Sequence, residues 1–146
     1  MGIFTTRLRL ALGALSLLLW LSACSTATIE FEPPRPKLYL NAVTAVSTTV
    51  GSNEDQIYFL FGNGERFPSS GSQVIREGQT WMPDIVVDAT MAGSARLFED
   101  DTLTGDDLIG TFNYNGGEVG VYTQTMTGGL SKYELEWEVR MVQTRR

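Results

Sequence analysis

The decisive stretch of this chain reads Lys132-Tyr133-Glu134-Leu135-Glu136-Trp137-Glu138-Val139-Arg140-Met141. Apolar and charged residues alternate throughout it. Successive side chains of a β-strand point to opposite faces of a sheet. The alternation therefore predicts a strand with one buried face and one charged face in water. The predicted buried set is Tyr133, Leu135, Trp137, Val139 and Met141.

Shorter apolar runs precede this strand at regular intervals, with turn residues between them. We expect strands around residues 38–43, 57–61, 85–87, 95–98, 108–112 and 119–125. Pro83, close to Trp81, indicates an edge strand or a bend, and Trp81 itself is expected in the core. Together these features predict an all-β fold, an antiparallel β-sandwich of about seven or eight strands.

The first 23 residues have the pattern of a secretory signal. Arg7 and Arg9 precede an apolar run at residues 10–21, which is shorter than the roughly 20 residues needed to span a bilayer. An uncleaved anchor helix, or an ordinary buried Cys24, is the alternative. The tetrapeptide Leu21-Ser22-Ala23-Cys24 resembles the lipobox of bacterial lipoproteins, which implies acylation of Cys24. By the same resemblance, Ser25 is compatible with sorting to the outer membrane.

Residues 24–36 are expected to form the lipidated cysteine and a proline-rich tether, and residues 37–146 the β-sandwich domain. Pro33, Pro34 and Pro36 favour an extended, semi-rigid spacer. Removal of residues 1–23 leaves nine basic residues against 17 acidic ones, a net charge of −8. Such an acidic chain is unsuited to binding nucleic acid or anionic lipid head groups, and it suits a cation, a basic partner or plain solubility.

An acidic loop is the main candidate site. The stretch from Glu99 to Asp107 holds five carboxylates in nine residues between two expected strands. Calcium takes six to eight oxygen ligands and would relieve the repulsion between these charges. A plain solvated turn is the alternative. The spacing does not fit an EF-hand.

This loop resembles the third top loop of C2 domains. That family commonly carries acid-x-Asp, five residues, Asp, two apolar residues and Gly. Here Glu99-Asp100-Asp101 and Asp107-Leu108-Ile109-Gly110 fit that spacing, and Asp55 before Ile57-Tyr58 resembles the acid of another C2 loop. The resemblance implies a C2-like sandwich that binds Ca²⁺. The implied ligands are Glu99, Asp101, Asp107 and Asp55, with Glu54, Asp100 and Asp106 as substitutes.

The chain departs from the C2 pattern at two positions. Glu99 stands where the family usually has Asp, and Thr49 stands where a further Asp is normally found, six residues before Asp55. A C2-like sandwich without metal, acting as a structural or docking module, is therefore the alternative to the calcium-binding one.

Catalysis is not expected. The chain contains no histidine, and its only cysteine is the predicted acylation site. These absences remove the usual general base and the usual thiol nucleophile. The sequence thus predicts a non-enzymatic lipoprotein of the bacterial outer membrane. Its partners would be the membrane, through the lipid, and an unidentified envelope protein.

Overall fold

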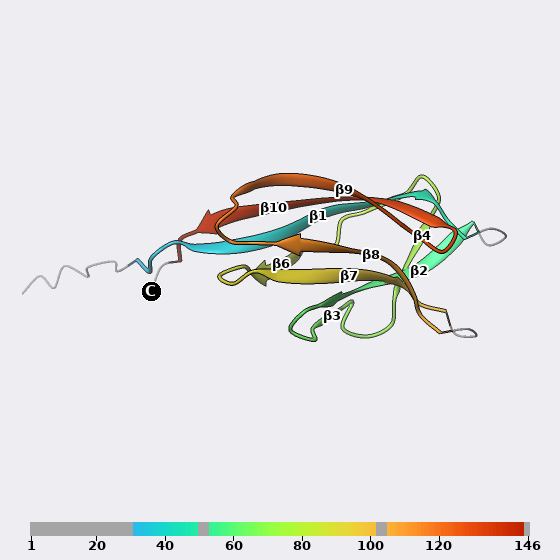
Figure 1. Ribbon diagram of the computed structural model, residues 1–146, viewed down its shortest axis with the longest axis horizontal. Helices are drawn as coiled ribbons and strands as arrows, with labels where there is room; N and C mark the ends of the chain where they lie inside the picture. The colour runs from blue at the N-terminus through green and yellow to red at the C-terminus, as the bar shows by residue number, and fades with distance from the viewer. Residues whose placement is uncertain (1–30, 50–52, 102–104, 145–146) are drawn as a thin grey trace, which may run out of the picture.

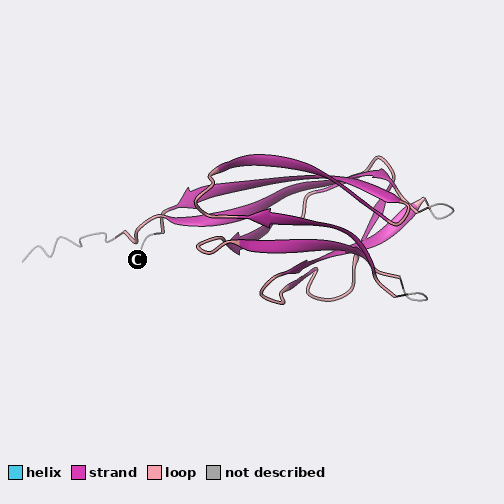
Figure 2. Cartoon of the chain, in the orientation of Figure 1, coloured by secondary structure: helices cyan, strands magenta, loops and turns pink. Residues whose placement is uncertain are grey.

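Two antiparallel sheets pack face to face in this chain. The computed structural model describes residues 31–49, 53–101 and 105–144, which form strands and loops (Figures 1 and 2). The lipobox and the predicted signal lie outside the described residues. Within the described part of the chain, no helix is long and apolar enough to cross a membrane.

The first sheet follows the order β5-β1-β10-β9, and β6 also pairs with β1. Its strands are β1 (Arg35–Ser47), β5 (Thr80–Trp81), β6 (Ile85–Asp88), β9 (Gly120–Gly128) and β10 (Ser131–Val142). The second sheet follows the order β3-β2-β7-β8, and β4 also pairs with β2. Its strands are β2 (Glu54–Phe61), β3 (Arg66–Phe67), β4 (Gln73–Arg76), β7 (Gly93–Glu99) and β8 (Asp107–Tyr114). The predicted all-β antiparallel sandwich is confirmed, with ten described strands in place of seven or eight.

The alternating stretch forms β10, which lies between β1 and β9. Four of its five predicted core residues are buried, but Met141 is 50% exposed, so that prediction was wrong. Met141 pairs with Pro36, where β1 and β10 extend past the end of the second sheet (Figure 1). Alternation indicates which face of the sheet a side chain occupies. Burial also requires that the other sheet cover that face at the same point.

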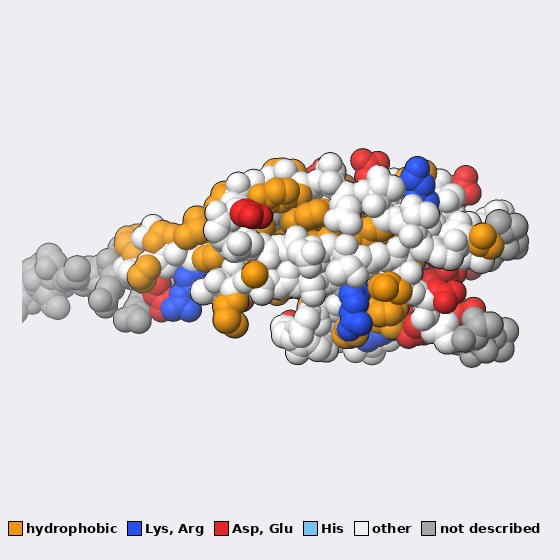
Figure 3. All heavy atoms as spheres, viewed as in Figure 1, with side chains coloured by type: hydrophobic (Ala, Val, Ile, Leu, Met, Phe, Trp, Pro, Cys, Tyr) orange, Lys and Arg blue, Asp and Glu red, His pale blue; other side chains and the backbone are white. Residues whose placement is uncertain are grey.

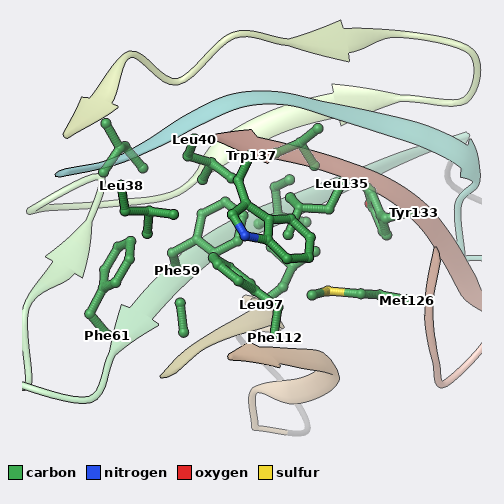
Figure 4. Close-up of a cluster of buried hydrophobic side chains, with 14 of the residues drawn as sticks. Leu38, Leu40, Phe59, Phe61, Leu97, Phe112, Met126, Tyr133, Leu135 and Trp137 are labelled. Carbon is green, nitrogen blue, oxygen red and sulfur yellow. The ribbon is translucent and has the colours of Figure 1, made fainter. Parts of the chain in front are cut away.

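Aromatic rings from both sheets meet in the core (Figure 4). The ring of Phe112 on β8 lies 4.7 Å from that of Trp137 on β10, and it contacts Phe59 edge-on at 6.4 Å. Such tilted and edge-on pairs add to the stabilisation from burial. Trp81 packs against this core from the edge strand β5, as predicted.

Pro36 stands at the start of a strand of the first sheet, and Pro83 stands between two of its strands. Strand β1 begins at Arg35, inside the segment expected as a tether, and Pro36 is its second residue. Proline is accepted there because it stands at the start of a strand. Its carbonyl also receives a hydrogen bond from the Ala89 amide, at 3.1 Å. Pro83 separates β5 from β6, which both pair with β1, so the predicted interruption at the edge is present.

Candidate functional site at the acidic end

Three connections meet at one end of the sandwich. They link β1 to β2, β7 to β8, and β9 to β10 (Figure 1). The acidic loop is the β7–β8 connection, and Asp55 lies at the start of β2 in the same region. Strand direction alone therefore gathers acids from residues about 50 apart in the sequence at one end of the fold.

Asp55 is buried between the sheets, with a relative exposure of 2%. Its Oδ2 accepts hydrogen bonds from the hydroxyls of Tyr133, at 2.6 Å, and Ser131, at 2.8 Å. Its Oδ1 accepts one from the backbone N–H of Thr49, at 2.9 Å. A buried carboxylate requires such donors because water cannot solvate it. Asp55 thus ties β2 of the second sheet to β10 of the first.

Glu99 ends β7 beside this network. The Thr49 hydroxyl lies 2.9 and 3.0 Å from its two carboxylate oxygens and donates to them. Burial raises the pKa of Glu99, and the nearby Asp55 and Asp107 raise it further, while the hydrogen bond from Thr49 acts against them. Both neighbouring carboxylates thus act electrostatically on Glu99, after the effect of burial.

Asp107 begins β8 and is paired in register with Glu99. Its side chain is exposed. Asp101 is half-buried at the start of the β7–β8 connection, whose residues 102–104 lie outside the described chain. Of the four ligands implied by the C2 resemblance, Asp55, Glu99 and Asp107 come from neighbouring strand ends, those of β2, β7 and β8.

The three substitute ligands face other partners. Glu54 forms an ion pair with Arg76 at 3.2 Å, and Asp100 forms one with Arg66 at 3.4 Å. Asp106 accepts a hydrogen bond from the Tyr58 hydroxyl at 2.5 Å.

Tyr58 belongs to an outer layer of the second sheet. The Arg66 guanidinium lies 3.8 Å from the centre of its ring, and Phe98 stacks on the ring at 5.3 Å. Burial, and then the hydrogen bond to Asp106, raise the pKa of Tyr58 to about 12. The acidic loop is therefore divided: Glu99 belongs to the network between the sheets, whereas Asp100 and Asp106 belong to this outer layer.

The donors of the Asp55 network were not predicted as site residues. Ser131 and Tyr133 are fully buried, and Thr49 was noted only as a departure from a motif. The one available signal was the alternation of β10, which places Tyr133 on the buried face with a hydroxyl that needs a partner. Within residues 31–49, 53–101 and 105–144, no three His, Cys, Asp or Glu side chains are grouped so as to hold a metal ion.

Comparison with known proteins finds similarity in structure only. No family model matches the chain, and no curated protein matches its sequence. Among solved structures, a pair of C2 domains from extended synaptotagmin 2 is 16% identical over 92% of this chain, with a TM-score of 0.48. A single C2 domain from plant extended synaptotagmin 1 is 10% identical over 76% of this chain and 98% of its own, with a TM-score of 0.44. Human GIVD cytosolic phospholipase A2 is 11% identical over 80% of this chain, with a TM-score of 0.44.

This chain spans 48% of the extended synaptotagmin 2 structure and 19% of the phospholipase structure.

Removal of the Tyr133 hydroxyl tests the role of the Asp55 network. We expect Tyr133→Phe to lower the free energy of unfolding by about 1–3 kcal/mol, because a buried carboxylate loses a donor that water cannot replace. Urea unfolding measures this loss. Tyr122→Phe is the matched control, since the Tyr122 hydroxyl donates to an exposed carbonyl, that of Glu118. Equal losses in the two variants would contradict a special role for the network.

The raised pKa of Glu99 predicts a dependence of stability on pH. Between its ordinary value of 4.5 and its raised value in the fold, the folded state binds more protons than the unfolded state. Stability from this residue is therefore present at low pH and lost as pH rises through that window. We expect Glu99→Gln to remove this loss, so that its advantage over the wild type is larger at pH 7 than at pH 4. A constant difference across that range would contradict the prediction.

Proposed function

We propose that this chain is a lipoprotein of the bacterial outer membrane, anchored through acyl chains on Cys24. Its C2-like sandwich would be a non-enzymatic module that docks another envelope protein without calcium. The observation that carries the metal-free proposal is the Asp55 network. The carboxylate at a C2 ligand position is already bound by three donors of the protein itself.

Support for the anchor comes from the sequence. A positive start, a short apolar run and small residues converge on Cys24. Several acyl chains hold a protein stably on a membrane where one chain is marginal. The non-enzymatic part of the proposal is supported by the sequence, which offers neither histidine nor a thiol free of the predicted lipid.

The residues at the acidic end fit a calcium cage poorly. Calcium needs six to eight oxygens that can turn toward one point. Asp55 points both of its oxygens at internal donors, and Thr49 supplies a hydroxyl donor to Glu99 where the C2 pattern has another carboxylate. Hydrogen-bond donors of the protein thus occupy the Asp55 carboxylate, which the C2 resemblance assigns to calcium.

A calcium-binding C2-like module is the second candidate. One observation favours it: burial raises the pKa of Glu99 first, the neighbouring carboxylates of Asp55 and Asp107 raise it further, and a cation would relieve that part of the shift. In this case Asp101 and Asp107 would supply the exposed side of the site.

Thermal melting with calcium and with chelator separates the two candidates. For the metal-free module we expect the same midpoint in both, measured on a soluble form beginning at residue 26. Calcium at 100 times its Kd would add roughly 2.7 kcal/mol, a rise of several degrees for a domain of this size. Such a rise, absent with magnesium and lost in an Asp101→Asn, Asp107→Asn double variant, would overturn the metal-free proposal.

Crosslinking in intact cells tests docking and anchoring together. We expect the wild-type protein to form one discrete adduct with an envelope protein, because anchoring confines both to one surface. The adduct should survive chelator and disappear in Cys24→Ala, whose fold we expect to be unchanged. An adduct that requires calcium, or that forms equally without Cys24, would contradict the proposal.

A further inference from the structure

The two ends of the sandwich differ in surface chemistry. Acids gather at the end described above, whereas hydrophobic side chains gather where the described chain begins (Figure 3). Among the residues that the structure describes, six of the eleven exposed large hydrophobic ones lie toward this second end, here called the apolar end: Phe31, Val86, Met91, Val119, Val121 and Met141.

Strand register places these residues together. Val86, Tyr39, Glu138 and Val121 form one row across β6, β1, β10 and β9. Met91 lies in the loop after β6, and Val119 lies just before β9. Met91 is 82% exposed and Val121 63% exposed, so the row and the loops present apolar surface to their surroundings.

Basic side chains border the apolar end. The Arg140 guanidinium lies 3.8 Å from the centre of the Tyr39 ring, and the Lys37 ammonium lies 3.0 Å from Asp88. Arg35 is 62% exposed and lies 4.0 Å from Glu32. Long basic side chains beside apolar ones are typical of surfaces at a membrane interface, where the charge meets headgroups and the stem lies along apolar groups.

Carboxylates also occur at this end, and three of them are paired with these bases. Asp88 faces Lys37, Glu32 faces Arg35, and Glu138 lies 3.8 Å from Arg140. Glu118, which precedes Val119, and Glu65 also lie at this end. Three bases thus stand beside five carboxylates, a net charge of 3 − 5 = −2 from these residues.

The length of the chain before the described residues limits where this end can lie. Six residues, 25–30, lie between Cys24 and Phe31. The seven steps from Cys24 to Phe31 reach at most about 25 Å when fully extended. A bilayer that holds Cys24 would therefore lie within that distance of the apolar end. The acidic end would stand farther off, by the length of β10, about 40 Å for its 12 residues.

We propose that the apolar end rests on the phospholipid surface in which Cys24 is anchored, so that the acidic end points away from it. This inference rests on the lipid anchor of the proposed function. The tether makes the contact intramolecular, so a weak apolar contact suffices. The apolar end thus fixes the orientation of the domain, while the acyl chains supply the affinity.

A fluorescent label at each end tests the orientation. The full-length protein, acylated in a Gram-negative host, would carry a new cysteine at Met91→Cys or Leu130→Cys, labelled with an environment-sensitive dye. Leu130 is the matched control: it is apolar, 65% exposed and lies in the β9–β10 turn at the acidic end. The vesicles would contain phosphatidylethanolamine and phosphatidylglycerol, with and without nitroxide-labelled lipid.

We expect the dye at position 91 to emit at shorter wavelength and to be quenched severalfold more by nitroxide lipid than the dye at position 130. Val121→Glu should weaken this quenching while the protein still floats with the vesicles. Equal quenching at both positions, or stronger quenching at 130, would overturn the proposal. A blue shift at 91 without quenching, growing with protein density, would mean that a second copy covers the end and would also overturn it.

Flotation separates failure of the anchor from failure of the orientation. Protein that does not float with the vesicles lacks the anchor, which overturns the proposed function and this inference together. Protein that floats while the dye at 91 remains in water overturns the orientation alone.

Discussion

The carboxylate of Asp55 lies between two sheets, where water cannot reach it, so the surrounding chain must supply its hydrogen bonds. Two hydroxyls from β10 and one amide from the end of β1 do so. These contacts join the first sheet to the second at the end where the core gives way to loops. A buried charge with its partners in place fixes their positions, because losing any one of them leaves the charge unsatisfied.

The same constraint explains why the acids of this end do not act as one group. Alternate residues of β2 face the core, so Asp55 points inward on the same side as Ile57 and Phe59. Asp100 and Asp106 instead meet Arg66 and Tyr58 in the outer layer of the second sheet. A nine-residue acidic stretch thus serves two layers of the molecule. Its density in the sequence overstates the density of carboxylates at any one point in space.

The sequence predicted the fold well where one periodicity governed a whole strand. The alternation of β10 identified a strand and four of its buried residues, and the position of Pro83 identified an edge. The prediction that Met141 is buried was wrong because its exposure depends on how far the second sheet extends. The sequence of β10 carries no information about that extent. The strands β3 and β4 escaped prediction because two and four residues carry too little periodicity.

The candidate site was only partly accessible from sequence. Resemblance to C2 loops predicted that Glu99, Asp101, Asp107 and Asp55 bind calcium, which stays a prediction; Asp55, Glu99 and Asp107 belong to neighbouring strand ends. It did not predict Ser131 and Tyr133, since these residues lie on a strand about 76 positions after Asp55. Only strand pairing brings their hydroxyls to the carboxylate. The sequence showed that Thr49 departs from the motif. Only the structure showed the consequence, which is that Thr49 supplies a hydrogen-bond donor where the motif has an acid.

The two ends of the sandwich give the proposed lipoprotein a direction. Strands β1 and β10 run the length of the first sheet, so whatever fixes one end also fixes where the other end points. An apolar end held near a bilayer by the six residues between Cys24 and Phe31 would present the acidic end to the space beyond the membrane. A rigid acidic end needs internal donors, because an end whose shape depended on calcium would change with the ion supply. In the proposed arrangement the Asp55 network and the apolar end are complementary: the network would preserve the shape of the acidic surface, and the apolar end would determine where that surface faces.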